Sequence, residues 1–269
     1  MSLPRVLAIP AAVVVILTVV GAWIDGSDSA SVASVDGAAE VTTPVADDGG
    51  DAAAATSVVP PSSSLAPAST VTPTTTSCTS VVHIGDSTSV GLISEDFIED
   101  PANRIDAQYR RVGVTDPRME ISGARSIVET VGDQLNAKEA AEAIKATGYE
   151  GCWVLAMGTT DTANVAVGSP TGLAERIDRM LSVIGDDPIM WVTVKTLDVD
   201  GAWSNTNMQT WNQTLTEAQA RYPNIEVYDW AAVVQDDWFQ DDNIHYTSVG
   251  YTERARLIAD ALVTAYPAS

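Results

Sequence analysis

Short apolar runs and longer amphipathic segments alternate along the chain from about residue 80 onward. Most of the short runs have the length of a buried strand and end near a turn residue, which is typical of a sheet core. The expected strands are Val81–Ile84, Cys152–Met157, Ile189–Val194 and Ile225–Tyr228, with another near Tyr109–Val114. The expected helices are Asn136–Ala146, Thr171–Ile184, Asn205–Arg221 and Thr247–Ala265. This alternation predicts βαβ units, and therefore an α/β fold whose mostly parallel sheet is covered by helices on both faces.

The N-terminal apolar run is much longer than the others. It extends over 19 residues, Val6–Ile24, without a charge, after Arg5 and before Asp25. A helix of that length nearly spans the hydrocarbon core of a bilayer, and its basic flank is expected on the cytoplasmic side. Residues 1–24 are therefore predicted to be a signal anchor or a cleaved signal peptide. We favour the anchor because the run is long and no clear A-x-A site follows it; both alternatives export the rest of the chain.

Residues 25–77 have a composition that cannot build a core. Small and polar residues dominate, with stretches such as Pro60-Pro61 and Thr74-Thr75-Thr76. Such a segment buries too little apolar area to offset the conformational entropy lost on ordering. We therefore expect a disordered linker over residues 25–77 and one folded domain over residues 78–269, which is long enough to bury a core of its own.

The chain is strongly acidic and contains two cysteines. It has 36 Asp and Glu against 14 Lys and Arg, for a net charge of -22. This balance disfavours nucleic acid and anionic lipid headgroups as partners, because both would repel it. Cys78 and Cys152 are too few to hold a structural zinc ion, and no histidine cluster accompanies them. In an exported protein they would form a disulfide; the alternative is two unrelated buried thiols.

Two short motifs carry residues that could perform chemistry. Gly85-Asp86-Ser87 follows the first expected strand, so Ser87 would have an exposed hydroxyl at a helix start and an N–H that can stabilise an oxyanion. Asp242-Asn243-Ile244-His245 places a carboxylate three residues before an imidazole, the general base that a nucleophilic serine needs. Each motif has a structural alternative: the first could be only a helix cap, and the second an acidic loop with a structural histidine.

Two further positions complete an ordered set. Gly123 is isolated, and Gly158-Thr159-Thr160-Asp161 follows the expected strand Cys152–Met157. Together with the Gly-Asp-Ser and Asp-x-x-His motifs, this order resembles the SGNH hydrolase family, also called GDSL-like hydrolases. The stretches that carry the resemblance are His83–Ser87, Trp153–Asp161, Val227–Ala231 and Asp242–Thr247. It spans nearly all of residues 78–269 and is closest to the SGNH domains appended to bacterial membrane acyltransferases and their free-standing actinobacterial relatives.

The resemblance implies a flavodoxin-like three-layer α/β/α domain and a role for each motif residue. Ser87 would be the nucleophile, His245 the general base and Asp242 the acid that orients it. The N–H groups of Ser87 and Gly123 and a side chain of the Gly-x-Asn-Asp motif would form the oxyanion hole. This chain departs from the motif, since Thr160 stands at the asparagine position and offers a shorter donor. Losing one oxyanion donor typically lowers the rate by about 10²–10³-fold.

The same resemblance bears on the cysteines and on the rim of the site. In the family's fold the serine-bearing strand neighbours the strand that carries Gly-x-x-Asp. Cys78 and Cys152 would then start adjacent strands about 4.8 Å apart, so a Cys78–Cys152 disulfide is expected. Trp203, Asn205 and Trp238 fall in or near loops on the strand-end side. They predict a substrate rim that binds sugar rings; the alternative is that the tryptophans only anchor loops to the core.

Together these features predict an exported serine esterase. Its substrate is expected to be an O-acyl ester of a cell-envelope glycan or glycolipid, by analogy of location and family. Transfer of the acyl group to a sugar hydroxyl would instead make it an O-acyltransferase; a catalytically weak glycan-binding module is the other alternative, favoured only by Thr160. We expect a monomer that meets the membrane through its N-terminal helix and uses no metal or organic cofactor. His83, the second histidine, is expected in the core.

Overall fold

Five parallel strands form a single sheet in the computed structural model, which describes residues 74–269. The strands are β1 (Ser80–Gly85), β2 (Asp116–Ile121), β3 (Cys152–Ala156), β4 (Ile189–Val192) and β5 (Ile225–Tyr228). Their order in the sheet is β2-β1-β3-β4-β5, the flavodoxin-like arrangement. The predicted α/β class with a parallel sheet is confirmed, and β1, β3, β4 and β5 coincide with four of the expected apolar runs.

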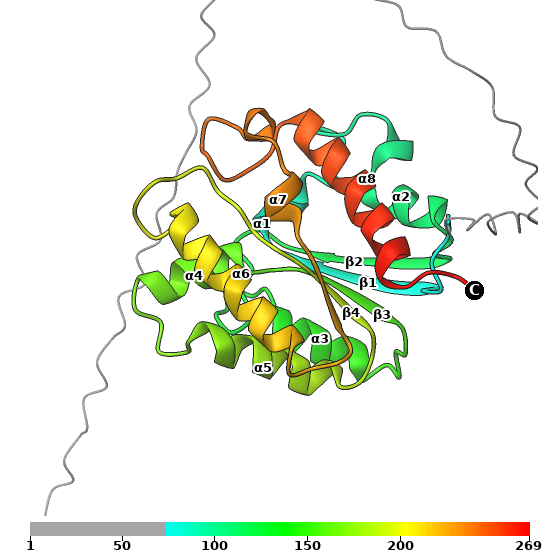
Figure 1. Cartoon of the computed structure of the whole chain (residues 1–269), viewed down its shortest axis with the longest axis horizontal. Coiled ribbons are helices and arrows are strands. Elements are labelled where there is room, and N and C mark those ends of the chain that lie inside the picture. Colours follow the sequence, from blue (N-terminus) through cyan, green and yellow to red (C-terminus); the bar gives the residue numbers. More distant parts are fainter. Residues whose placement is uncertain (1–73) are drawn as a thin grey trace, which may run out of the picture. The chain divides into compact units, whose positions relative to one another are not determined.

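Helices cover both faces of this sheet, which gives three layers (Figure 1). One face carries α2 (Ile105–Arg111), α7 (Trp230–Val233) and α8 (Ser248–Ala265). The other carries α3 (Ala137–Lys145), α4 (Thr159–Ala166), α5 (Leu173–Ile184) and α6 (Asn205–Gln219). A short helix, α1 (Ser87–Val90), follows β1 directly, and two 3₁₀ turns span Pro101–Asn103 and Asp236–Trp238. The α3, α5, α6 and α8 helices match the expected ones apart from one or two residues at their ends.

The central strands β1, β3 and β4 have nearly continuous apolar sequences because both faces of each strand are buried. Successive side chains point to opposite faces, so Val81 belongs to the cluster under α8, whereas Val82 belongs to the cluster under α5 and α6. The same alternation places Val154 on the α8 side and Trp153 on the other. The polar motifs follow the strands at the carboxyl edge of the sheet.

The strand expected near Tyr109–Val114 is wrong. Tyr109 lies in α2, and the second strand begins later, at Asp116. Ile105, Tyr109 and Val112 are all buried at helical spacing. The true strand, β2, lies at the edge of the sheet, and all of its residues are exposed or half-buried, so it contains no apolar run.

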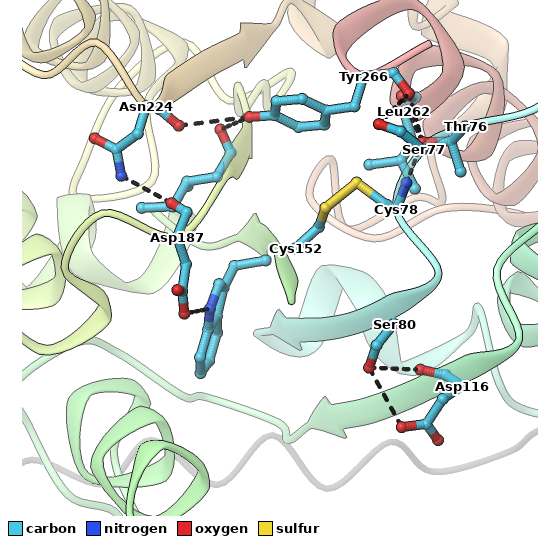
Figure 2. The surroundings of a disulfide bond; sticks show 12 residues. Thr76, Ser77, Cys78, Ser80, Asp116, Cys152, Asp187, Asn224, Leu262 and Tyr266 are labelled. Carbon is cyan, nitrogen blue, oxygen red and sulfur yellow. Dashed lines mark hydrogen bonds between the residues drawn. A yellow bond between two sulfur atoms is a disulfide. The ribbon is translucent and has the colours of Figure 1, made fainter. Parts of the chain in front are cut away.

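A disulfide joins Cys78 to Cys152 at the amino edge of the sheet, with a Cα–Cα distance of 5.8 Å (Figure 2). Cys152 begins β3, and Val81 of the neighbouring β1 pairs with it in register. The end of α8 packs at the same edge, where the Thr76 hydroxyl donates to the Tyr266 carbonyl at 2.7 Å (Figure 2). The start of the described chain is therefore held covalently and by hydrogen bonds.

Replacing both cysteines by serine is expected to lower the free energy of unfolding by about 3 kcal/mol, because the disulfide restricts the unfolded chain over a long loop. The two cysteines are 74 residues apart in the sequence. Urea unfolding followed by tryptophan fluorescence measures the change. An equal stability of oxidised wild type and the double variant would contradict this expectation.

The predicted signal segment, residues 1–24, lies outside the described residues, as does the predicted linker up to residue 73. Within residues 74–269, no helix has both the length and the apolar character needed to cross a bilayer.

Candidate active site

Three side chains from two distant segments form a hydrogen-bonded chain at the carboxyl edge of the sheet. The Ser87 hydroxyl lies 2.9 Å from Nε2 of His245. On the other side of the ring, Nδ1 of His245 lies 2.6 Å from an Oδ2 oxygen of Asp242. Ser87 follows β1, whereas the other two precede α8. This is the arrangement in which an imidazole can take a proton from a serine while a carboxylate holds the ring.

Asp86 explains why the Ser87 hydroxyl is free for this contact. The Asp86 carboxylate caps α1, accepting from the Thr88 backbone N–H at 2.9 Å and from the Thr88 hydroxyl at 2.7 Å. Asp86 is fully buried, and burial raises the pKa of its carboxyl group. The motif therefore does contain a helix cap, but the cap is the aspartate and not the serine.

A tight turn holds Asp242 and His245 in place. Oδ1 of Asp242 accepts from the backbone N–H groups of Ile244 at 3.0 Å and His245 at 2.9 Å, which leaves Oδ2 for the ring. Asn243 takes a left-handed conformation, φ 63°, which asparagine tolerates better than most residues. Partial burial opposes ionisation of Asp242, but hydrogen bonds from His245 and Ile244 outweigh it and lower the pKa. Asp242 is therefore a carboxylate that can stabilise a charged imidazole.

His83, the second histidine of residues 74–269, is not placed to act as a base for Ser87. Its ring is fully buried on the α8 side of the sheet, where Nδ1 lies 2.8 Å from the Tyr109 hydroxyl. Burial, and then the charge of Arg254, lower the pKa of His83 to about 3. The ring is neutral at physiological pH and has no contact with Ser87.

Two backbone N–H groups near Ser87 are free to bind an oxyanion. Ser122 at the end of β2 donates to the Gly85 carbonyl at 3.2 Å, which brings the Gly123 turn beside the start of α1. Among residues 74–269, no protein acceptor takes the N–H of Ser87 or of Gly123. A Cβ built on Gly123 would meet nothing within 4 Å, so the turn borders open space. These are the two backbone donors that the sequence analysis expects.

The third expected donor, Thr160, lies in the first turn of α4. Its side chain is buried, and Oγ1 has no hydrogen-bond partner within the described part of the chain. Its neighbour Thr159 also has a buried, unpartnered hydroxyl. Asn164, the asparagine of α4, is engaged elsewhere, because its Nδ2 donates to Glu129 at 3.0 Å.

A buried arginine in α5 ties the Gly123 loop to α4. We call Arg176, Asp161 and Glu129 the Arg176 cluster. Arg176 is fully buried; its Nη1 donates to Oδ1 of Asp161 at 2.8 Å and to Oε2 of Glu129 at 2.6 Å. The same Asp161 oxygen accepts from the Ile127 backbone N–H at 2.9 Å. Three segments, the loop after β2, α4 and α5, therefore meet at one guanidinium group.

The carboxylates of the Arg176 cluster are perturbed in opposite directions. Burial raises the pKa of Asp161 to about 6, although Ile127 and Arg176 oppose the shift. Glu129 is less buried, and hydrogen bonds from Arg176 and two serines overcome its burial and lower its pKa to about 2. Sequence reasoning missed this cluster; the only signal was an arginine on the otherwise apolar face of α5.

Two hollows lie near the hydrogen-bonded chain of Ser87, His245 and Asp242. An apolar pocket of about 260 Å³ is lined by Ser87, Val90, Gly91, Phe97, Gln240, His245 and Tyr251. A polar groove of about 370 Å³ lies beyond β4 and is lined by Lys195, Thr196, Leu197, Asp198, Val199, Asn205, Thr206, Gln209 and Asp236. Two lining residues of the groove contact the Asp242–His245 turn. Nδ2 of Asn243 donates to Asp198 at 3.1 Å, and the Leu197 N–H donates to the Asn243 carbonyl at 2.8 Å.

The three expected rim residues have different surroundings. Trp203 packs against the core cluster under α5 and α6, whereas Trp238 packs against the cluster under α8 and stacks on Trp230. Only Asn205 lines the polar groove. These contacts are consistent with the alternative, in which the tryptophans pack loops against the core; a sugar-binding rim made of all three stays a prediction.

No family model matches the chain, and no curated protein matches it. Solved structures do match. One is a carbohydrate acetylesterase family member from Sinorhizobium meliloti, at 12% identity and a TM-score of 0.55, covering 69% of this chain and 98% of that one. Another is the inhibitor-bound aryl esterase of M. smegmatis, at 13% identity and a TM-score of 0.53, covering 68% and 98%.

A third match is a protein from Desulfitobacterium hafniense assigned to the G-D-S-L family of lipolytic proteins. It has 13% identity and a TM-score of 0.51, with 68% of this chain and 98% of that chain covered. At such identities the likeness concerns the fold. The parallel sheet in the order β2-β1-β3-β4-β5, with Gly-Asp-Ser after β1 and Asp-x-x-His before α8, agrees with it. Residues 74–269 have the fold of the SGNH, or GDSL-like, hydrolases.

Proposed function

We propose that this chain is a serine esterase that cleaves O-acyl esters through an acyl-enzyme on Ser87. The observation that carries the proposal is the unbroken chain of hydrogen bonds from Asp242 through His245 to the Ser87 hydroxyl. The free N–H groups of Ser87 and Gly123 support it, because they offer donors for the oxyanion that forms when an ester carbonyl is attacked. The esterases among the fold neighbours are consistent with the same chemistry.

The mechanism follows from these positions. The Ser87 hydroxyl oxygen attacks the carbonyl carbon of the ester, and Nε2 of His245 takes the hydroxyl proton. The carbonyl oxygen becomes an oxyanion, which accepts hydrogen bonds from the N–H groups of Ser87 and Gly123. Asp242 stabilises the imidazolium. When the C–O bond to the alcohol breaks, His245 passes its proton to the departing alkoxide oxygen. Water then attacks the acyl-enzyme by the same route, which releases the acid and restores Ser87.

The proposed substrate is an acylated carbohydrate outside the cytoplasm. A neighbour of the same fold is described as a carbohydrate acetylesterase, and the apolar run at Val6–Ile24 is the basis for export. The disulfide supports an oxidising compartment, because such bonds are rare in the cytosol. The proposed mechanism needs no metal or organic cofactor, since every proton and every charge in it is carried by the chain's own groups.

A fluorophosphonate probe and p-nitrophenyl acetate test the proposal directly. The probe is expected to form one covalent adduct at Ser87, located by mass spectrometry, and to stop acetate hydrolysis in proportion. Ser89 is the internal control, since it is two residues away but fully buried. A protein that neither hydrolyses the ester nor reacts with the probe would instead be a binding module.

Thr160→Val tests the third oxyanion donor. This change removes the hydroxyl and keeps the side-chain shape, so kcat is expected to fall by about 10²-fold if that hydroxyl binds the oxyanion. Thr159→Val is the matched control, because its hydroxyl is also buried and unpartnered. Equal small effects of the two changes in steady-state kinetics would remove Thr160 from the oxyanion hole.

A further inference from the structure

The pocket beside Ser87 is lined mainly by apolar side chains. Of its seven lining residues, Ser87 and His245 belong to the proposed triad, and the only other polar side-chain groups are the Gln240 amide and the Tyr251 hydroxyl. The remainder are Val90 and Gly91 from α1 and its end, Phe97 from the following loop, and Tyr251 from α8. One end of the pocket is therefore formed by Ser87 and His245, and the rest of its lining is mostly apolar.

A glycine and two aromatic rings give the pocket its shape. A Cβ at Gly91 would lie 2.3 Å from the Tyr251 ring, so the ring can approach α1 only because this residue is a glycine. The Phe97 and Tyr251 rings pack at 5.0 Å between centroids. Tyr251 is buried, whereas Val90 is 38% exposed and lies toward solvent. The aromatic pair therefore forms a fixed wall and Val90 lies at the mouth.

The polar groove near the Asp242–His245 turn differs from this pocket in the polarity of its lining. The polar groove is lined by charged and amide side chains, among them Asp198, Asn205 and Gln209. Lys195 is paired with Asp236 there at 2.7 Å. A hydrocarbon chain in this groove would strip water from polar groups without replacing their hydrogen bonds.

We propose that the apolar pocket holds the acyl chain of the ester and selects chains longer than acetyl; this rests on the esterase function proposed above. In the acyl-enzyme the carbonyl carbon is bonded to Ser87 Oγ, so the chain must start among the atoms that line this pocket. A cavity of about 150 Å³ accommodates benzene. The pocket measures about 260 Å³, which leaves room for a chain of about six to eight carbons.

The test compares p-nitrophenyl acetate, butyrate, hexanoate and octanoate with the whole protein. The alcohol stays constant, so a trend in kcat/KM reports the acyl side alone. Because the pocket is open to solvent, we expect kcat/KM to rise about two- to fourfold per added methylene up to hexanoate, and to level off by octanoate. A flat or falling series, in a protein that hydrolyses the acetate, would overturn the proposal.

Two valine variants locate the chain. Val90→Trp fills the mouth of the apolar pocket and is expected to reduce the hexanoate-to-acetate ratio of kcat/KM by at least fivefold. Val199→Trp puts the same ring into the polar groove, where Val199 is 90% exposed; it is expected to keep the wild-type ratio. A ratio reduced by Val199→Trp and unaffected by Val90→Trp would show that the acyl chain lies in the groove, and would overturn the proposal.

The failure of this inference can be told apart from the failure of the proposed function. If Ser87 reacts with a fluorophosphonate and acetate is hydrolysed while chain length has no effect, the esterase stands and the pocket proposal falls. If no ester is hydrolysed and Ser87 is not labelled, the esterase itself falls, and with it the pocket.

Discussion

Replacing Ser87 by alanine is expected to lower kcat for p-nitrophenyl acetate by about 10⁴–10⁶-fold, to the rate that the remaining binding groups support. The attacking oxygen is lost, so no acyl-enzyme can form. His245→Gln is expected to have an effect of similar size, since the hydroxyl 2.9 Å away then has no base. The two losses should not add in the double variant, because the residues act as one unit.

The controls for this prediction lie in the same short stretch of sequence. Ser89→Ala and His83→Gln alter the second serine and the second histidine of the region, both of which are fully buried. Each is expected to keep kcat within a few-fold of wild type. A Ser89→Ala enzyme as inactive as Ser87→Ala would contradict the assignment of the nucleophile.

Replacing Arg176 by methionine is expected to lower the free energy of unfolding by about 4 kcal/mol, the largest stability loss predicted for this chain. Asp161 is fully buried and takes its 2.8 Å ion pair from Arg176 alone, so removing the guanidinium leaves a buried carboxylate without a counter-charge. Methionine keeps most of the volume and is a good helix former. Urea unfolding measures the loss.

Arg179→Met is the matched control, three residues further along α5. Arg179 pairs with Glu175 at the surface, with both side chains about half exposed, and such pairs contribute about 0–1 kcal/mol. Similar losses for the two arginines would rule out a special role for the Arg176 cluster.

Acid pH offers a second readout of the same cluster. The folded-state pKa of Glu129, about 2, lies below its ordinary value of 4.5, so its contribution to stability is complete above pH 4.5 and is lost as the pH falls toward 2. In Arg176→Met this acid-sensitive contribution is expected to become smaller.

The apolar pattern predicts the interior strands of this fold and the edge strand β5 correctly, but it misses the other edge strand, β2. β1, β3 and β4 are buried on both faces, so nearly every position in them is apolar and the sequence shows them as apolar runs. β2 has a neighbour on one side only and carries Asp116, which hides it from a search for apolar runs. α4 was also missed, because a glycine followed by threonines is typical of a turn.

The short sequence motifs predicted those site residues that lie close together in the sequence or directly after a recognisable strand. Asp242 and His245 lie on one turn, and Ser87 follows a strand whose end is easy to find. The Arg176 cluster is different, because Glu129 and Arg176 are 47 residues apart and no spacing rule joins them. Its one visible trace is positional: Arg176 falls on the face of α5 that carries the buried Ile177 and Met180, where an unpaired charge would be costly.

Both ends of the described chain lie at the same edge of the sheet, which matters for handling the protein. Thr75 and Ala268 are hydrogen-bonded to each other at 2.9 Å, next to the Cys78–Cys152 disulfide at the amino edge of the sheet. Ser87 lies at the other end of β1, about 20 Å away along the six-residue strand. A resin, an affinity handle or a sensor chip coupled at the C-terminus would therefore leave the Ser87 edge of the sheet facing outward.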